Sequence, residues 1–83
     1  MFDFVETYLP PGEQKADNHH YGVQVFNPTP EVAHVRIQIG SASVDLRLAP
    51  EGLVTVDDEH SQDIRVENLS SSALSVIWKK TRD

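Results

Sequence analysis

Cysteine is absent from this chain, which removes two ways of stabilising a small protein. Without thiols there are neither disulfide bonds nor thiolate metal sites. The chain has 83 residues, which we expect to form one domain over residues 1–83. A domain of this size buries only about two-thirds of the surface that its unfolded chain exposes. We therefore expect it to self-associate or to dock on a larger protein assembly.

Positive charge is also scarce, with seven Lys and Arg against thirteen Asp and Glu and a net charge of -6. A negative field repels the phosphate backbone, so we expect no nucleic-acid partner. The one basic cluster is Lys79, Lys80 and Arg82, which is too short for an anion groove. We interpret this cluster as the solvated end of a terminal strand.

Long hydrophobic runs are missing as well. No segment approaches the ~20 apolar residues of a membrane span. The first residues, Met1 to Glu6, lack the basic start and apolar run of a signal peptide. The sequence thus predicts a soluble protein, cytoplasmic as synthesised, with no insertion into a membrane.

What the chain does contain is a regular alternation of apolar and polar residues, most clearly over Ala33 to Leu48 and Asp63 to Trp78. Alternation broken by a small-residue turn is typical of a β-hairpin. The seven expected strands are Phe2 to Leu9, Tyr21 to Asn27, Val32 to Ile39, Val44 to Leu48, Leu53 to Val56, Asp63 to Asn68 and Ala73 to Lys79. We predict an all-β fold: a single small antiparallel β-sandwich of about seven short strands, or alternatively a small β-barrel. No helix and no internal repeat is expected.

The two hairpins also predict a register and a core. Folding the first about Ser41-Ala42 places Val35 opposite Leu48 and Arg36 opposite Arg47. Folding the second places Ile64 opposite Trp78. The expected core is Val23, Val25, Val35, Ile37, Ile39, Leu46, Leu48, Val54, Val56, Ile64, Val66, Val76 and Trp78.

Two polar segments, Glu13 to His20 and Asp57 to Gln62, are expected to be loops. Imidazoles and carboxylates within them are candidate metal ligands, with Asp17 as an additional one, and they allow a third function, that of a metal-dependent binder or enzyme. These candidates are His19, His20, Asp57, Asp58 and His60. The alternative is that both segments are solvated polar loops, the acidic one steering a basic partner.

Catalytic patterns are lacking. The serines lie mostly in expected turns, without a nucleophile-elbow glycine pattern or a phosphate-cradling glycine loop. A sandwich of this length also offers little concave volume for a substrate. We therefore expect no catalytic residues, no enzymatic activity and no cofactor.

Aromatic residues gather in the first third of the chain, and one core cannot bury all of them. Aromatic side chains are enriched at the centres of protein interfaces. The candidate interface residues are Phe2, Phe4, Tyr8, Tyr21 and Phe26, together with His34 on a polar strand face. The alternatives are that the aromatics cap the open end of the sandwich and that His34 is an ordinary surface histidine. The sequence predicts a homo-oligomer or a subunit of a larger assembly, such as a capsid-decoration or tail-accessory protein of a phage or virus particle.

Three segments carry a resemblance to a known family. Glu6 to Gly12 (ETYLPPG) forms an early strand that runs into a double proline. Phe26-Asn27 is followed after five residues by Ala33 to Ile37 (AHVRI), and Val66 to Asp83 contains the last strands and the tail. Together they resemble the sensory rhodopsin transducer family of small soluble β-sandwich proteins. The resemblance implies a cytosolic, oligomeric, non-enzymatic protein that transmits a signal or binds a small ligand.

Overall fold

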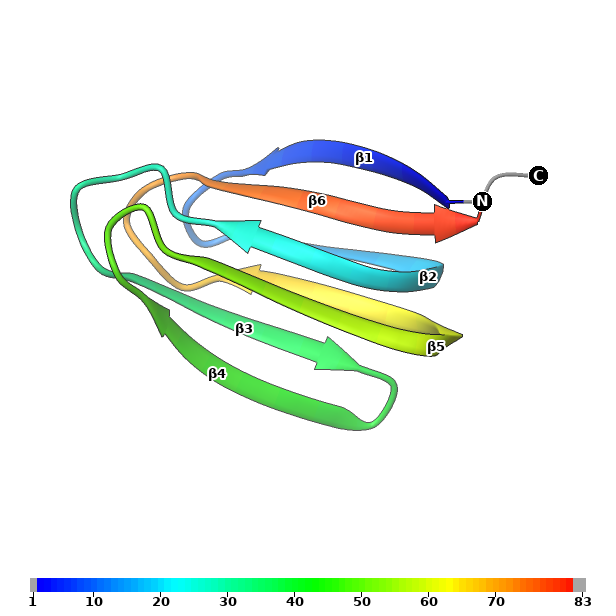
Figure 1. Cartoon of the computed structure of the whole chain (residues 1–83). Coiled ribbons are helices and arrows are strands. Elements are labelled where there is room, and N and C mark those ends of the chain that lie inside the picture. The colour runs from blue at the N-terminus through cyan, green and yellow to red at the C-terminus, as the bar shows by residue number, and fades with distance from the viewer. Residues whose placement is uncertain (1, 82–83) are drawn as a thin grey trace.

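The computed structural model describes residues 2–81, and within them it leaves the side chains of residues 17–20, 59, 61, 62 and 81 undescribed. The strands are β1 (Phe2–Leu9), β2 (Gln14–Phe26), β3 (Ala33–Ile39), β4 (Ala42–Leu48), β5 (Leu53–Asn68) and β6 (Leu74–Thr81). Figure 1 shows them side by side in the order β1-β6-β2-β5-β3-β4, with every pairing antiparallel. The predicted all-β fold is confirmed. No helix that could span a membrane occurs in the described residues.

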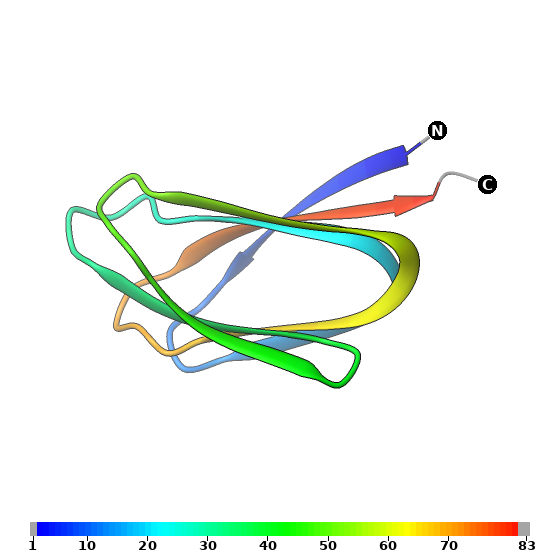
Figure 2. The same ribbon diagram turned by 60° about the horizontal axis from the view of Figure 1, so that its bottom comes forward.

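The sheet bends over on itself into two layers, which Figure 2 shows from the side. The long strands β2 and β5 bend together and take part in both layers. The first part of β5 pairs with residues 22–26 of β2, whereas its second part pairs with β3 and with the start of β2. The result is a small antiparallel sandwich with one layer ending at β1 and the other at β4.

The two segments expected to be loops are instead strand, so the described chain has six strands where the sequence predicted about seven. Expected strands Leu53 to Val56 and Asp63 to Asn68 are the two ends of β5. The polar residues between them pair with β2, through Asp57 opposite Gly22 and Gln62 opposite His20. Pairing with a neighbouring strand satisfies the backbone hydrogen-bonding groups of these polar segments, whatever their side chains are. The segments therefore form strand without the apolar alternation that the sequence analysis used to identify strands. Register shifts on both sides of His20 accompany the bend.

The first hairpin is confirmed, but its register is displaced by two residues from the prediction. Val35 faces Leu46 and Arg36 faces Asp45. The turn is Gly40-Ser41, and Gly40 adopts a φ of 58°, as the first central residue of a type II′ turn does. A shift of two residues preserves the side-chain alternation, so the inward face remains apolar.

The second predicted hairpin is wrong, because β5 and β6 do not pair. Ile64 faces Ile39 of β3, whereas Trp78 faces Val5 of β1 and Val23 of β2. The segment after Asn68 carries the chain from one layer to the other. Alternation showed correctly which side chains point inward, but it holds no information about which strand is the neighbour.

Strands β1–β3 and β4–β6 form two halves with the same topology. Exchanging β1 with β4, β2 with β5 and β3 with β6 turns the strand order into its own reverse. The expectation of no internal repeat is therefore wrong at the level of structure. The halves share few residues, among them Asn27 and Asn68 at the corners and Val35 and Val76 in β3 and β6, which are too few to reveal the repeat in the sequence.

Two fully buried asparagines form these corners, Asn27 at the end of β2 and Asn68 at the end of β5. Asn27 Oδ1 accepts hydrogen bonds from the backbone N and the Oγ1 of Thr29, and its Nδ2 donates to the carbonyls of Glu31, Leu48 and Ala49. Asn68 Oδ1 accepts from Ser70 N, and its Nδ2 donates to the carbonyls of Leu9 and Ser72. Each amide thus ties the strand end to the following turn and to the strand β4 or β1.

The core lies between the layers. Its buried hydrophobic residues are Leu9, Val23, Val25, Ala33, Val35, Ile37, Leu48, Ile64, Val66, Leu74, Val76 and Trp78. Nine of the thirteen predicted core residues are in this set. The other four, Ile39, Leu46, Val54 and Val56, are partly buried and pack against it.

Candidate functional site

The aromatic candidates lie on a single layer of the sandwich. Phe2, Phe4 and Tyr8 belong to β1, while Tyr21 and Phe26 belong to β2, two strands away in the same layer. Phe2, Phe4, Tyr8 and Phe26 stand at strand positions that alternate with the inward residues, and Ile77 of β6 shares their outward position. We call these five outward residues, Phe2, Phe4, Tyr8, Phe26 and Ile77, the aromatic face.

One end of the aromatic face is held by ring contacts. The rings of Phe2 and Tyr21 meet edge to face with centroids 5.3 Å apart. Lys79 Nζ lies 4.5 Å from the centroid of the Phe2 ring and 3.5 Å from Asp57 Oδ1. These contacts order one aromatic side chain on β1 and cover part of it.

The middle and far end of β1 are open. Phe4 is 67% and Tyr8 is 69% exposed, and β1 ends the strand order, so only one of its sides has a neighbouring strand in the described chain. An unpaired strand edge that carries exposed aromatic side chains can accept another strand. Of the two alternatives for the aromatics, exposure at these two positions favours an interface over a cap.

His34 does not join this group, because it lies on β3 in the other layer. Its backbone N donates to Ser70 Oγ (2.6 Å), and its carbonyl accepts from Leu69 N and Ser70 Oγ. The backbone of His34 therefore anchors the corner that follows Asn68. An interface role for its half-buried side chain stays a prediction.

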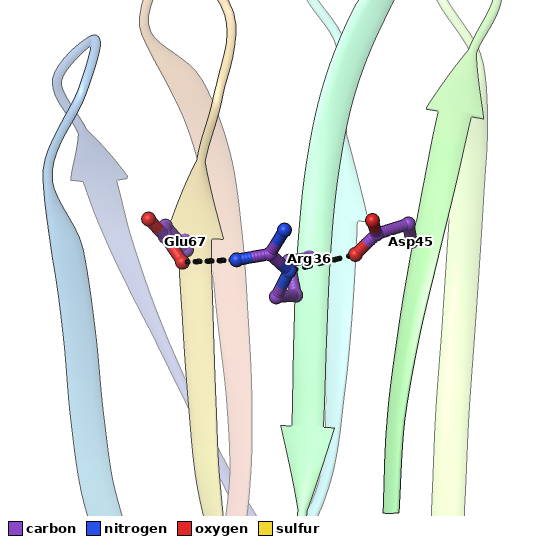
Figure 3. A network of polar contacts seen from close by, with 3 residues as sticks. All are labelled: Arg36, Asp45 and Glu67. Carbon is purple, nitrogen blue, oxygen red and sulfur yellow. Dashed lines mark hydrogen bonds and ion pairs between the residues drawn. The ribbon is translucent and has the colours of Figure 1, made fainter.

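The outer surface of that second layer carries an ion cluster, shown in Figure 3. Arg36 Nε lies 2.8 Å from Asp45 Oδ1, and Arg36 Nη1 lies 3.3 Å from Glu67 Oε1. The hydrogen bond from Arg36, the charge of Arg36 and that of His34 hold the pKa of Asp45 below its ordinary value, and the bond to Asp45 raises the pKa of Arg36. The predicted register placed Arg36 opposite Arg47 and made Asp45 only a diagonal neighbour, whereas Asp45 faces Arg36 directly in the structure. Glu67 was not expected beside Arg36, because the sequence did not predict that β3 pairs with β5.

Corresponding positions on the two outer surfaces have opposite character. Arg36 stands between Asp45 on the edge strand and Glu67 on the inner strand. In the other layer, Ile77 stands between Glu6 on the edge strand and Gln24 on the inner strand. One surface is therefore covered by paired charges, whereas the other keeps an apolar centre.

The structure describes the side chains of only some of the candidate metal ligands. Asp57, Asp58 and His60 all lie on β5, where Asp58 Oδ1 accepts a hydrogen bond from the backbone N of His60 (3.0 Å). The side chains of Asp17, His19 and His20 lie outside the described residues. Among the described residues no group of three or more His, Cys, Asp or Glu could hold a metal ion. A metal site in this region stays a prediction.

The chain resembles several solved structures in fold. A de novo designed double-stranded beta-helix, solved by NMR, aligns with a TM-score of 0.59 at 17% identity over 94% of this chain and 99% of that one. A cupin domain from Bordetella pertussis aligns with a TM-score of 0.59 at 17% identity over 99% of this chain and 82% of that one.

A third similar structure is the capsular polysaccharide assembling protein CapF from Staphylococcus aureus. It aligns with a TM-score of 0.59 at 15% identity over 96% of this chain but only 25% of CapF. No family model matches the chain, and neither does any curated protein sequence. The resemblance to sensory rhodopsin transducers stays a prediction. What these likenesses establish is the fold, a double-stranded β-helix of the kind that cupin domains adopt.

Proposed function

We propose that this chain is a non-enzymatic interaction module that pairs with a second copy of itself through the free edge of β1 and the aromatic face. The observation that carries the proposal is the exposure of Phe4 and Tyr8 on a strand that has only one neighbouring strand among residues 2–81. Covering these rings would remove apolar surface from water, which is the main driving force of association.

The two edge strands of the sandwich support this choice of surface. On β4, Asp45 and Arg47 are exposed, and charged side chains protect an edge against pairing. On β1, the outward positions are occupied mainly by aromatic residues, and no Lys or Pro interrupts the strand. β1 also carries two charged residues, Asp3 and Glu6, so what distinguishes the two edges is the aromatic content of β1.

The β1 sequence is also compatible with pairing to itself. Residues opposite each other in an antiparallel pair point to the same face of the sheet. When two copies of β1 pair about a twofold axis, one residue of β1 must therefore lie at the axis, opposite the same residue of the other copy. A register centred on Val5 places Phe2 opposite Tyr8 and Phe4 opposite Glu6. No like charges face each other directly in this register, whereas a register centred on Glu6 would pair two carboxylates.

The described interior supports a binding role rather than a catalytic one, since its buried side chains are mostly apolar and the buried Asn27, Asn68 and Ser75 are hydrogen-bonded within the fold. A capsid-decoration or tail-accessory subunit is one concrete form of the proposal, because such a subunit acts through its outer surface. A signalling protein of the resembled transducer family would use the same self-association.

Analytical ultracentrifugation at micromolar concentration tests the proposal. We expect the wild-type protein to sediment with twice the monomer mass. The double variant Phe4→Lys/Tyr8→Lys should be monomeric. Its melting temperature should be close to that of the wild-type protein diluted until it is monomeric, since both side chains are exposed. Ser43→Lys, at an exposed position of the β4 edge, is the matched control and should remain dimeric. A monomeric wild type, or a double variant that still dimerises, would overturn the proposal.

A further inference from the structure

A small apolar pocket opens between the two layers, near the tip of the β3–β4 hairpin. Its volume is about 230 Å³, and it is lined by Ile37, Ile39, Ala42, Ser43, Val44 and Val56. Five of these six side chains are aliphatic, and none carries a charge. From this pocket we infer a binding site for one uncharged, indole-sized aromatic molecule, a function independent of the proposed self-association.

Apart from Ser43, which faces Gln38, the lining residues of the pocket occupy inward positions of the sandwich. Ile37 faces Val44 and Ile39 faces Ala42, so both pairs lie on the core side of the hairpin. Val56 closes the pocket from the other layer, where it faces the buried Val23. Val44 is nevertheless 45% exposed, because nothing in the described chain covers it. Apolar surface is thus left open to water at a position that the strand pattern directs inward.

The other half of the molecule shows what fills the corresponding place. Ile37 faces Val44 on the edge strand β4, and Trp78 faces Val5 on the edge strand β1. The indole of Trp78 is only 2% exposed, and its Nε1 donates to Thr7 Oγ1 (3.1 Å). Where one half of the fold encloses its own indole, the other half has a smaller isoleucine and an open pocket.

Volume and polarity restrict the ligand further. An apolar cavity of roughly 150 Å³ is enough to bind benzene, so a pocket of about 230 Å³ has room for a second ring. A charged group would lose its hydration without gaining a partner, because Ser43 is the only lining residue with a polar side chain. An uncharged bicyclic aromatic molecule satisfies both restrictions.

Titration of the ¹⁵N-labelled protein with indole, followed by two-dimensional NMR, tests the inference. We expect saturable shifts of the amide resonances of β3, β4 and the first part of β5, and a higher melting temperature. The anion indole-3-carboxylate should cause neither. No saturable shift up to millimolar indole, or shifts centred on the aromatic face, would overturn the inference. So would hairpin shifts on dilution without indole, which would mean that a second copy covers the pocket.

Val44→Phe, which fills the pocket from within, should weaken indole binding by about tenfold or more. Val5→Phe, at the corresponding position of the other half, is the matched control and should leave indole affinity unchanged. Ala42→Leu fills the same pocket by a different route if Val44→Phe does not fold. Unchanged affinity in a folded pocket variant would contradict the inference, whatever the oligomeric state of the protein.

Discussion

The two halves of this sandwich share a topology but differ in what fills and covers it. Both have a buried asparagine at the corresponding corner, and both direct an alternating set of aliphatic residues inward. They differ at Trp78 and Ile37 in the interior, and at Ile77 and Arg36 on the outer surface. The shared positions are those that the fold needs, so the differing positions are where a specific function is to be sought.

The largest expected difference between the halves is in the interior. Trp78→Ala should lower the free energy of unfolding by about 3–5 kcal/mol, because it empties an enclosed site and removes the hydrogen bond that Nε1 donates to Thr7 Oγ1. Ile37→Ala should cost less, about 2–3 kcal/mol, because the open pocket beside it allows the site to collapse.

Urea unfolding, monitored by circular dichroism, measures both values. Equal costs would mean that the pocket is as rigid as the enclosed site, and the contrast between the halves would lose its energetic basis. Should Trp78→Ala fail to fold, Trp78→Phe provides the measurement with a smaller cavity.

The second comparison concerns the shared corners and predicts equality. Asn27→Ala and Asn68→Ala should each lower the free energy of unfolding by about 2–3 kcal/mol, because each leaves buried carbonyls without a donor. Asn68→Asp should be at least as destabilising at neutral pH, since a carboxylate cannot donate to Leu9 O and Ser72 O.

Gln38→Ala, on the outer face of β3, is the control for the corner variants and should change the stability by less than about 0.5 kcal/mol. A corner variant that behaves like this control would show that its asparagine does not hold the turn.

These corners also show where sequence reasoning reached its limit. Alternation correctly separated inward from outward side chains, because the pleat imposes a period of two. It could not pair the strands: Trp78 was placed opposite Ile64, but its neighbours are Val5 and Val23. Strand order depends on long-range contacts, and the bend of β2 and β5 through polar residues leaves no periodic signal.

The candidate site was predicted in the same uneven way. Excess aromatic residues in the first third correctly indicated exposed rings on β1, since one core cannot enclose them all. The ion cluster was predicted only in part: a register error of two residues placed Asp45 diagonally to Arg36, although Gly40 was available to indicate the two-residue turn. Glu67 was missed because the pairing of β3 with β5 was not predicted. The pocket depends on the small Ala42 facing Ile39, a contact that only the correct register brings together.

The smallest expected effect is a pH-dependent contribution to stability from the charged outer surface, for which the aromatic face has no counterpart. The pKa of Asp45 lies below its ordinary value in the folded protein, chiefly because of the hydrogen bond from Arg36. A lowered carboxyl pKa contributes stability that is present above the unfolded pKa and is lost as the pH falls through the folded pKa. Wild type should therefore melt slightly above Asp45→Asn at neutral pH, and this difference should vanish in acid.

The test becomes sharper when Arg36 is replaced by isoleucine, the residue that stands at the corresponding position, Ile77, in the other half. In an Arg36→Ile background the main charge partner of Asp45 is gone and only the smaller effect of His34 is left, so adding Asp45→Asn should change the melting temperature at neutral pH much less than it does in wild type. Thermal melts of the four proteins at neutral and acidic pH complete this double-mutant cycle. If Asp45→Asn lowers the melting temperature by the same amount with and without Arg36, the exposed ion pair contributes nothing to the stability of the fold. The contrast between the charged and the aromatic surface would then concern association alone.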